Sequence, residues 1–151
     1  MVANDPAARE WFPAERVVAD DAPGTGPLGG IAAGLAAANG SSIIVLAWDM
    51  PFVPPALLAA LWRRGTPGVD AVVPADGSRR EPLCAWYAAS ALSTCRALLD
   101  AGERRAGALA ERLAGTCWLP FVEIEAFGES ERVFTSVDTS ARLAALGGAL
   151  P

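Results

Sequence analysis

The residue best suited to chemistry in this sequence is a single carboxylate. Asp49 directly follows the apolar run at 42–48 (SIIVLAW) and precedes Met50-Pro51-Phe52. In open α/β sheets, ligands bind beyond the carboxyl ends of the strands, where the connecting loops diverge. A carboxylate there can bind Mg²⁺, which takes one or two protein carboxylates together with substrate phosphates. Two interpretations remain open: Asp49 is a metal ligand, or it caps the turn before the next helix.

A glycine-rich segment at 20–30 (DDAPGTGPLGG) leads into a predicted helix. The positive end of a helix dipole favours an anion or the hydrogen-bonding edge of a base, whereas a plain Pro/Gly turn is the alternative. The glycines Gly24, Gly26 and Gly29 also fit the dinucleotide pattern G-x-G-x-x-G. We reject that interpretation because DDAP separates the preceding strand from the first glycine, and its two carboxylates would face the pyrophosphate.

Two further groups of polar residues have competing explanations. Arg79 and Arg80 could contact phosphates or could lie in a solvated turn. Asp138 stands just before the last predicted helix, where an N-cap is the simplest role for an aspartate.

Periodicity predicts the elements that must position these residues. Strands are expected at 16–19, 42–48, 70–75, 82–88 and 117–127, the last interrupted by Pro120 near an edge of the sheet. Helices are expected at 26–39, 54–65, 90–102, 106–115 and 139–146. Strands alternating with short helices predict an α/β layered fold with a mainly parallel sheet. The run at 42–48 has the continuous apolar character of a strand buried on both faces.

Composition limits the function further. The 151 residues are 52% hydrophobic and 19% charged, which predicts one domain spanning 1–151. A net charge of −5 argues against nucleic acid binding, and no apolar run is long enough to span a bilayer. The sequence contains no histidine and no lysine, which excludes Ser-His-Asp catalysis and Schiff-base chemistry. Three cysteines without a Cys-x-x-Cys pair predict reduced thiols in a cytoplasmic protein.

Five motifs occur in a specific order along the chain: VAND, GPLGGI, VLAWDMPF, EPLCAWY and TSVDT. In this order they resemble the molybdenum cofactor guanylyltransferases (MobA-type) of the NTP transferase family. The resemblance implies a Rossmann-like, three-layer nucleotide-diphospho-sugar-transferase-like fold. It also implies Mg²⁺-dependent transfer of GMP from GTP to molybdopterin, with release of pyrophosphate.

The resemblance assigns roles position by position. Asp49 would be the catalytic residue and the Mg²⁺ ligand, and Ser136 and Asp138 stand where the family motif usually has two asparagines. Asp138 could be a second metal ligand. The residues implied to lie by the nucleotide are Asn4, Asp20, Gly26, Pro27, Leu28 and Gly29.

The sequence departs from the family in one respect. The opening strand and Gly-rich phosphate loop of these enzymes have no counterpart here, so the resemblance predicts an N-terminally truncated domain with weak GTP binding. Several alternatives to guanylyl transfer onto molybdopterin therefore stay open: an inactive chain, a non-catalytic nucleotide-binding or interaction module, a cytidylyltransferase of the same family, and guanylyl transfer to a cobamide precursor. An exposed sheet face in such a chain also predicts a homodimer.

Overall fold

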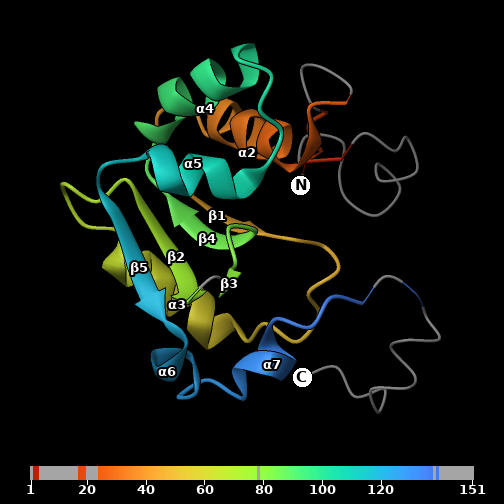
Figure 1. The fold of residues 1–151 in the computed structure, drawn as a ribbon, viewed down its shortest axis with the longest axis vertical. Coiled ribbons are helices and arrows are strands. Elements are labelled where there is room, and N and C mark those ends of the chain that lie inside the picture. The colour runs from red at the N-terminus through yellow and green to blue at the C-terminus, as the bar shows by residue number, and fades with distance from the viewer. Residues whose placement is uncertain (1, 4–16, 20–23, 78, 138, 140–151) are drawn as a thin grey trace.

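The fold is built on one five-stranded sheet. The computed structural model describes residues 2–3, 17–19, 24–77, 79–137 and 139. The strands are β1 (Ile43–Leu46), β2 (Ala71–Asp76), β3 (Arg79–Arg80), β4 (Cys84–Tyr87) and β5 (Thr116–Pro120). Their order is β1-β4-β2-β3, with β5 paired to β2 (Figure 1).

The sheet is mixed, which corrects the expectation of a mainly parallel one. Among the described strands, β4 is antiparallel to both β1 and β2, and β3 is antiparallel to β2. Only β2 and β5 pair in parallel. The reason is local: β2 reverses through a turn at Gly77 (φ 54°) directly into β3, and so short a connection can join only antiparallel strands. β1, β2 and β5 nevertheless run in one direction, so their carboxyl ends lie at the same edge of the sheet.

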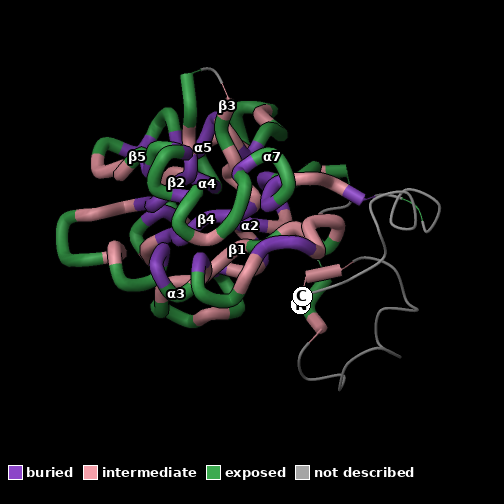
Figure 2. Tube along the Cα trace, turned by 90° about the horizontal axis from the view of Figure 1, so that it is seen from below, coloured by how far each residue is buried: buried purple, intermediate pink, exposed green. Residues whose placement is uncertain are grey.

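Helices cover both faces of the sheet, so the three-layer α/β architecture is confirmed (Figure 1). On one face, α2 (Gly26–Ala37), α4 (Ala91–Asp100) and α5 (Ala106–Arg112) pack against Val73 and Tyr87. On the other, α3 (Pro55–Arg64), α6 (Phe121–Ile124) and α7 (Ser130–Val133) pack against Val72 and Trp86. Neighbouring residues of a strand point to opposite faces, which is why Val72 and Val73 belong to different clusters. Figure 2 shows the buried segments gathered between these layers.

The helix predicted at 26–39 forms with the predicted core face. Leu28, Ile31 and Leu35 are 0%, 1% and 2% exposed, respectively. The helix is followed by Asn39 at φ 47° and Gly40 at φ 88°, the left-handed conformation that commonly ends a helix.

Two predicted strands differ from the structure. The run at 42–48 was expected to be buried on both faces, but β1 is only half-buried, with Leu46 40% and Trp48 83% exposed. β1 pairs only with β4 within the described part of the chain, which leaves its other side uncovered there. The segment 117–127 forms a strand only to Pro120 and then the helix α6, because Phe121 and Ile124 repeat at helical spacing onto the core.

Other predicted elements are confirmed by β2, β4, α3, α4 and α5. The predicted strand at 16–19 appears as a single parallel bridge between Val18 and Val2. The predicted helix at 139–146 lies outside the described residues except for Thr139. No helix in the described ranges is long and apolar enough to cross a membrane.

The three cysteines are free thiols. Burial raises the pKa of Cys84 to about 12 and that of Cys95 to about 11, so neither is poised as a nucleophile.

Candidate functional site

Asp49 lies in a turn just past the carboxyl end of β1. Backbone hydrogen bonds fix the turn: Met50 donates to the Ala47 carbonyl (3.2 Å), and Ala47 donates to the Leu83 carbonyl (2.8 Å). Phe52 and Val53 are each 7% exposed and anchor the chain just beyond Asp49. The carboxylate is therefore held on a fixed loop at the sheet edge where the sequence placed it.

The segment 136–137 crosses this loop. The Ser136 hydroxyl donates a hydrogen bond to Oδ2 of Asp49, and the Val137 amide donates to the Asp49 carbonyl at 2.7 Å. Nearby, the Arg132 guanidinium lies 5.1 Å from the centre of the Phe52 ring, which ties α7 to the same loop. The strand-end carboxylate thus contacts the C-terminal motif, a contact that was not predicted from the sequence.

The start of α2 is bound to the segment that follows α4. Gly26 has φ 64°, and a Cβ added there would lie 3.0 Å from the Arg104 carbonyl oxygen. The same oxygen accepts a hydrogen bond from the Leu28 amide at 3.2 Å. Pro27 has no amide hydrogen, so the helix start offers an anion fewer free amides than the sequence suggested.

The predicted ligand residues in α2 divide into two pairs. Leu28 is fully buried and its carbonyl accepts a contact from the Cys95 thiol at 3.5 Å, and Gly29 is buried beneath the Thr25 side chain. Gly26 and Pro27 lie at the exposed start of the helix. Of these four residues, only Gly26 and Pro27 are exposed, and contact of any of them with a nucleotide stays a prediction.

The EPLCAWY motif has a structural explanation. Residues 81–84 form a β-turn in which Cys84 donates to the Glu81 carbonyl at 3.0 Å, with Pro82 at the position where proline is favoured. The Tyr87 hydroxyl donates to the Pro82 carbonyl at 2.8 Å from the fully buried side of β4. The Pro-Leu-x-x-x-Tyr spacing thus locks a turn onto the strand that follows it.

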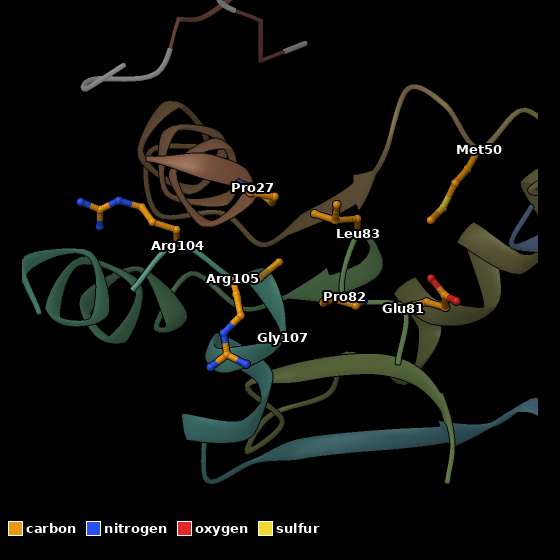
Figure 3. Close-up of a pocket in the computed structure, with 9 residues that line it drawn as sticks. Pro27, Met50, Glu81, Pro82, Leu83, Arg104, Arg105 and Gly107 are labelled. Carbon is orange, nitrogen blue, oxygen red and sulfur yellow. The ribbon is translucent and has the colours of Figure 1, made fainter. Parts of the chain in front are cut away.

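These segments enclose a pocket of about 380 Å³ (Figure 3). Its walls come from Pro27 at the start of α2, Met50 beside Asp49, the turn 81–83, and residues 104–107. Three motifs that are far apart in the sequence are thereby brought together at one site. The walls are mostly apolar, with the Glu81 carboxylate and the two arginines as the charged groups.

The segment 103–105 was not predicted to belong to the site. Glu103 accepts hydrogen bonds from the amides of Arg104 (2.8 Å) and Arg105 (2.9 Å), and its carboxylate pairs with the Arg105 guanidinium at 2.8 Å. These bonds hold the pKa of Glu103 down, at about 2. The signal available in the sequence was the pair of adjacent arginines, Arg104 and Arg105, that follows Glu103 after the Gly102 helix stop.

Arg79 and Arg80, in contrast, are engaged within the fold. Arg79 pairs with Glu81 (2.9 Å), and Arg80 pairs with Glu111 and lies 4.8 Å from the centre of the Trp118 ring. The explanation as turn residues therefore fits the structure better than contact with phosphates. Asn4, Asp20 and Asp138 lie outside the described residues.

The donor set around Asp49 fits one hard cation held by few protein ligands. No cluster of three acidic, cysteine or histidine residues occurs within the described ranges. Mg²⁺ does not need one, because water and substrate phosphates complete its octahedral shell. The Ser136 bond occupies Oδ2 and orients the carboxylate, which leaves Oδ1 for a metal.

A mixed α/β sheet with a carboxylate past a strand end, and a pocket beside it that reaches the glycine-rich start of α2, is the arrangement of an α/β domain that binds its ligand at the carboxyl ends of its strands. A family model described as MobA-like NTP transferase domain matches residues 1–116, and the chain belongs to this family. The match includes Asp49 and every residue that lines the pocket.

Curated relatives support this family. The chain is 44% identical over 108 residues, 70% of its length, to a probable molybdenum cofactor guanylyltransferase of Chloroflexus aggregans. It is 34% identical over 122 residues, 79% of its length, to one of Methanothermobacter thermautotrophicus. The aligned regions cover 51% and 61% of these two relatives, so the chain spans little more than half of their length.

Solved structures share the fold. Molybdopterin-guanine dinucleotide biosynthesis protein A from Archaeoglobus fulgidus superposes with a TM-score of 0.77 at 30% identity, over 95% of this chain and 74% of that one. A protein from Aquifex aeolicus superposes with a TM-score of 0.72 over 92% of this chain and 70% of that one, at 19% identity. The predicted nucleotide-diphospho-sugar-transferase-like fold is confirmed.

Proposed function

We propose that this chain is a nucleotidyltransferase domain that moves GMP from GTP to molybdopterin with the help of Mg²⁺. The observation that carries the proposal is the position of Asp49, oriented by Ser136 beside a pocket built from three family motifs. The relatives named above as molybdenum cofactor guanylyltransferases supply the substrate class.

In the proposed reaction a terminal phosphate oxygen of molybdopterin attacks the α-phosphorus of GTP. The new P–O bond forms as the bond to the β-phosphate oxygen breaks, and pyrophosphate leaves with that electron pair. The nucleophile is already ionised at neutral pH, so no histidine or other general base is required. Catalysis then consists of positioning and charge neutralisation, which is sufficient for phosphoryl-type transfers.

The residues of this chain have distinct tasks in that scheme. Asp49 would hold Mg²⁺, which neutralises charge on the phosphates when bound. Gly26 and Pro27 form the wall of the pocket at the positive end of the α2 dipole. Arg105 lies at the pocket rim with its side chain 75% exposed, and it would have to leave its ion pair with Glu103 in order to bind phosphate.

Calorimetric titration with GTP, with and without Mg²⁺, tests the proposal. Asp49→Asn should abolish the Mg²⁺-dependent part of GTP binding, because the neutral amide is a poor ligand for a hard cation. Asp100→Asn, the same change of charge at the exposed end of α4, is the matched control and should bind as the parent does. Tight GTP binding that is indifferent to both Mg²⁺ and Asp49 would contradict the proposal.

One observation favours a second candidate, a non-catalytic module that associates as a homodimer. β1 pairs on one side only within the described ranges, and Leu46 and Trp48 at its end are 40% and 83% exposed. An uncovered strand edge with apolar side chains favours association. Light scattering of a monomer, together with GTP turnover in the presence of molybdopterin, would eliminate this candidate.

A further inference from the structure

The pocket contains one carboxylate, that of Glu81, and its other walls are mostly apolar apart from Arg104 and Arg105. Glu81 belongs to the wall formed by the turn 81–83, and its side chain is 12% exposed (Figure 3). In Figure 3 its carboxylate points toward the side of the pocket where the Met50 side chain reaches in. A carboxylate withdrawn from water in this way needs hydrogen-bond donors to offset its lost hydration.

The protein supplies only part of that compensation. Arg79 Nε donates to Oε1 of Glu81 at 2.9 Å, while no donor from the described part of the chain is paired with Oε2. Burial raises the pKa of Glu81, and the neighbouring Arg79 opposes this shift. The side chain is therefore fixed by Arg79 on one oxygen and retains acceptor capacity on both.

The backbone around Glu81 is also fixed. Its amide donates to the Pro74 carbonyl at 3.0 Å, and its carbonyl accepts from Cys84 at 3.0 Å. Pro74 belongs to β2 and Cys84 to β4, and these are inner strands of the sheet. Glu81 thus presents its carboxylate from a rigid base, which is what selective recognition requires.

We propose that Glu81 selects a planar heterocycle with two adjacent N–H donors on one edge, the 2-amino-4-oxo-pyrimidine edge that guanine and pterins share. The apolar side chains of Pro27, Met50 and Leu83 would contact the ring, and the two carboxylate oxygens would accept the ring N–H and the exocyclic amino N–H side by side. A heterocycle with a carbonyl in place of the amino group would direct an acceptor at the carboxylate and be rejected. The inference rests on the proposed function, because this pocket adjoins the Asp49 site.

Two probe pairs test the inference with the full chain. Guanosine monophosphate is compared with inosine monophosphate, which lacks the 2-amino group, and pterin is compared with lumazine, in which that group is an oxygen. Affinities are measured by calorimetry for the nucleotides and by fluorescence for the pteridines. A guanine preference would assign Glu81 to the nucleotide base, and a pterin preference to the acceptor.

The variants separate recognition from the loss of an ion pair. Glu81→Gln should weaken the amino-bearing member of the recognised pair on the order of 10- to 100-fold and remove its advantage, since it loses a charge-assisted pair of hydrogen bonds. Glu131→Gln is the matched control, because Glu131 also pairs with Arg79, at 3.4 Å, but its side chain is 89% exposed. It should leave both affinities unchanged. Circular dichroism establishes that each variant is folded, and Glu81→Asp, which withdraws the carboxylate by one methylene, should weaken binding as well.

The outcomes distinguish this inference from the proposed function. Discrimination that is unchanged in folded Glu81→Gln, or a parent that binds none of the four probes, overturns the inference. If discrimination is unchanged in Glu81→Gln but GTP binding still requires Mg²⁺ and Asp49, the inference about Glu81 fails and the transferase proposal stands. A pterin preference that depends on Glu81, in a chain with no Mg²⁺-dependent GTP binding, supports the inference and overturns the transferase.

Discussion

The Ser136 hydroxyl donates a hydrogen bond to the Asp49 carboxylate across 87 positions of sequence. The Val137 amide adds a second bond, to the Asp49 carbonyl at 2.7 Å. The orientation of Asp49, the candidate metal ligand, therefore depends on the segment 136–137. The Ser136 hydroxyl that bonds to its carboxylate is uncharged.

Ser136→Ala should lower Mg²⁺-dependent nucleotide affinity by about tenfold, because residues that orient a metal ligand typically contribute that much. The measurement is a Mg²⁺ titration at fixed GTP. Ser93→Ala removes a hydroxyl in α4 that donates to the carbonyl of Ser90, the residue just before this helix, and it should have no effect. Equal affinities in the parent and both variants would show that Asp49 does not need this bond.

Tyr87→Phe should reduce the free energy of unfolding by about 1–2 kcal/mol, since it leaves the Pro82 carbonyl without its hydroxyl donor. Urea denaturation measures the change. Because the turn 81–83 forms one wall of the pocket, ligand binding should weaken along with stability. A variant as stable as the parent would mean that the Pro-Leu-x-x-x-Tyr spacing has another cause.

Gly26→Ala should destabilise the chain by about 1–2 kcal/mol, because an L-residue at φ 64° is strained and its Cβ would lie 3.0 Å from the Arg104 carbonyl. Gly107→Ala is the control: it lies in α5, and its Cβ would meet nothing within 4 Å. There alanine should be neutral or stabilising, by up to about 1 kcal/mol. Thermal unfolding of the two variants in parallel gives the comparison.

Glu103→Gln should make the free energy of unfolding depend less on pH in the acid range, below pH 4.5. The pKa of Glu103 is lowered from 4.5 to about 2, so its contribution to stability is present above pH 4.5 and is lost as the pH falls toward 2. The free energies of unfolding of parent and variant, measured from pH 5 down to the lowest pH at which both are folded, should converge as the pH drops. A constant difference across that range would indicate that the Glu103 carboxylate is not bonded as described.

Glu81→Gln should show the opposite dependence. Because burial raises the pKa of Glu81 above 4.5, its contribution to stability is greatest below that pH and declines as the pH rises through the raised pKa. The stability of Glu81→Gln relative to the parent should therefore improve from pH 4 toward neutrality. A relative stability that stays level or worsens would place the carboxylate in a better solvated position.

The sequence predicts best those helices and strands whose structure depends mainly on their own residues. The spacing of Leu28, Ile31 and Leu35 requires only a helix with one buried face, and the structure has it. The direction of β4 depends on the Gly77 turn, and helical spacing after Pro120 competes with strand propensity, so both were missed. For the site, Asp49 was identified because strand ends are visible in a sequence, whereas the walls at 104–107 arise from packing between α2 and the segment after α4.

The turn at 81–83 runs without interruption into β4, and β4 pairs with strands on both of its sides. One continuous stretch of chain therefore forms both a wall of the pocket and an inner strand of the sheet. Substitutions in the turn 81–83 that would fit a new ligand must also preserve the pairing of β4 with β1 and β2.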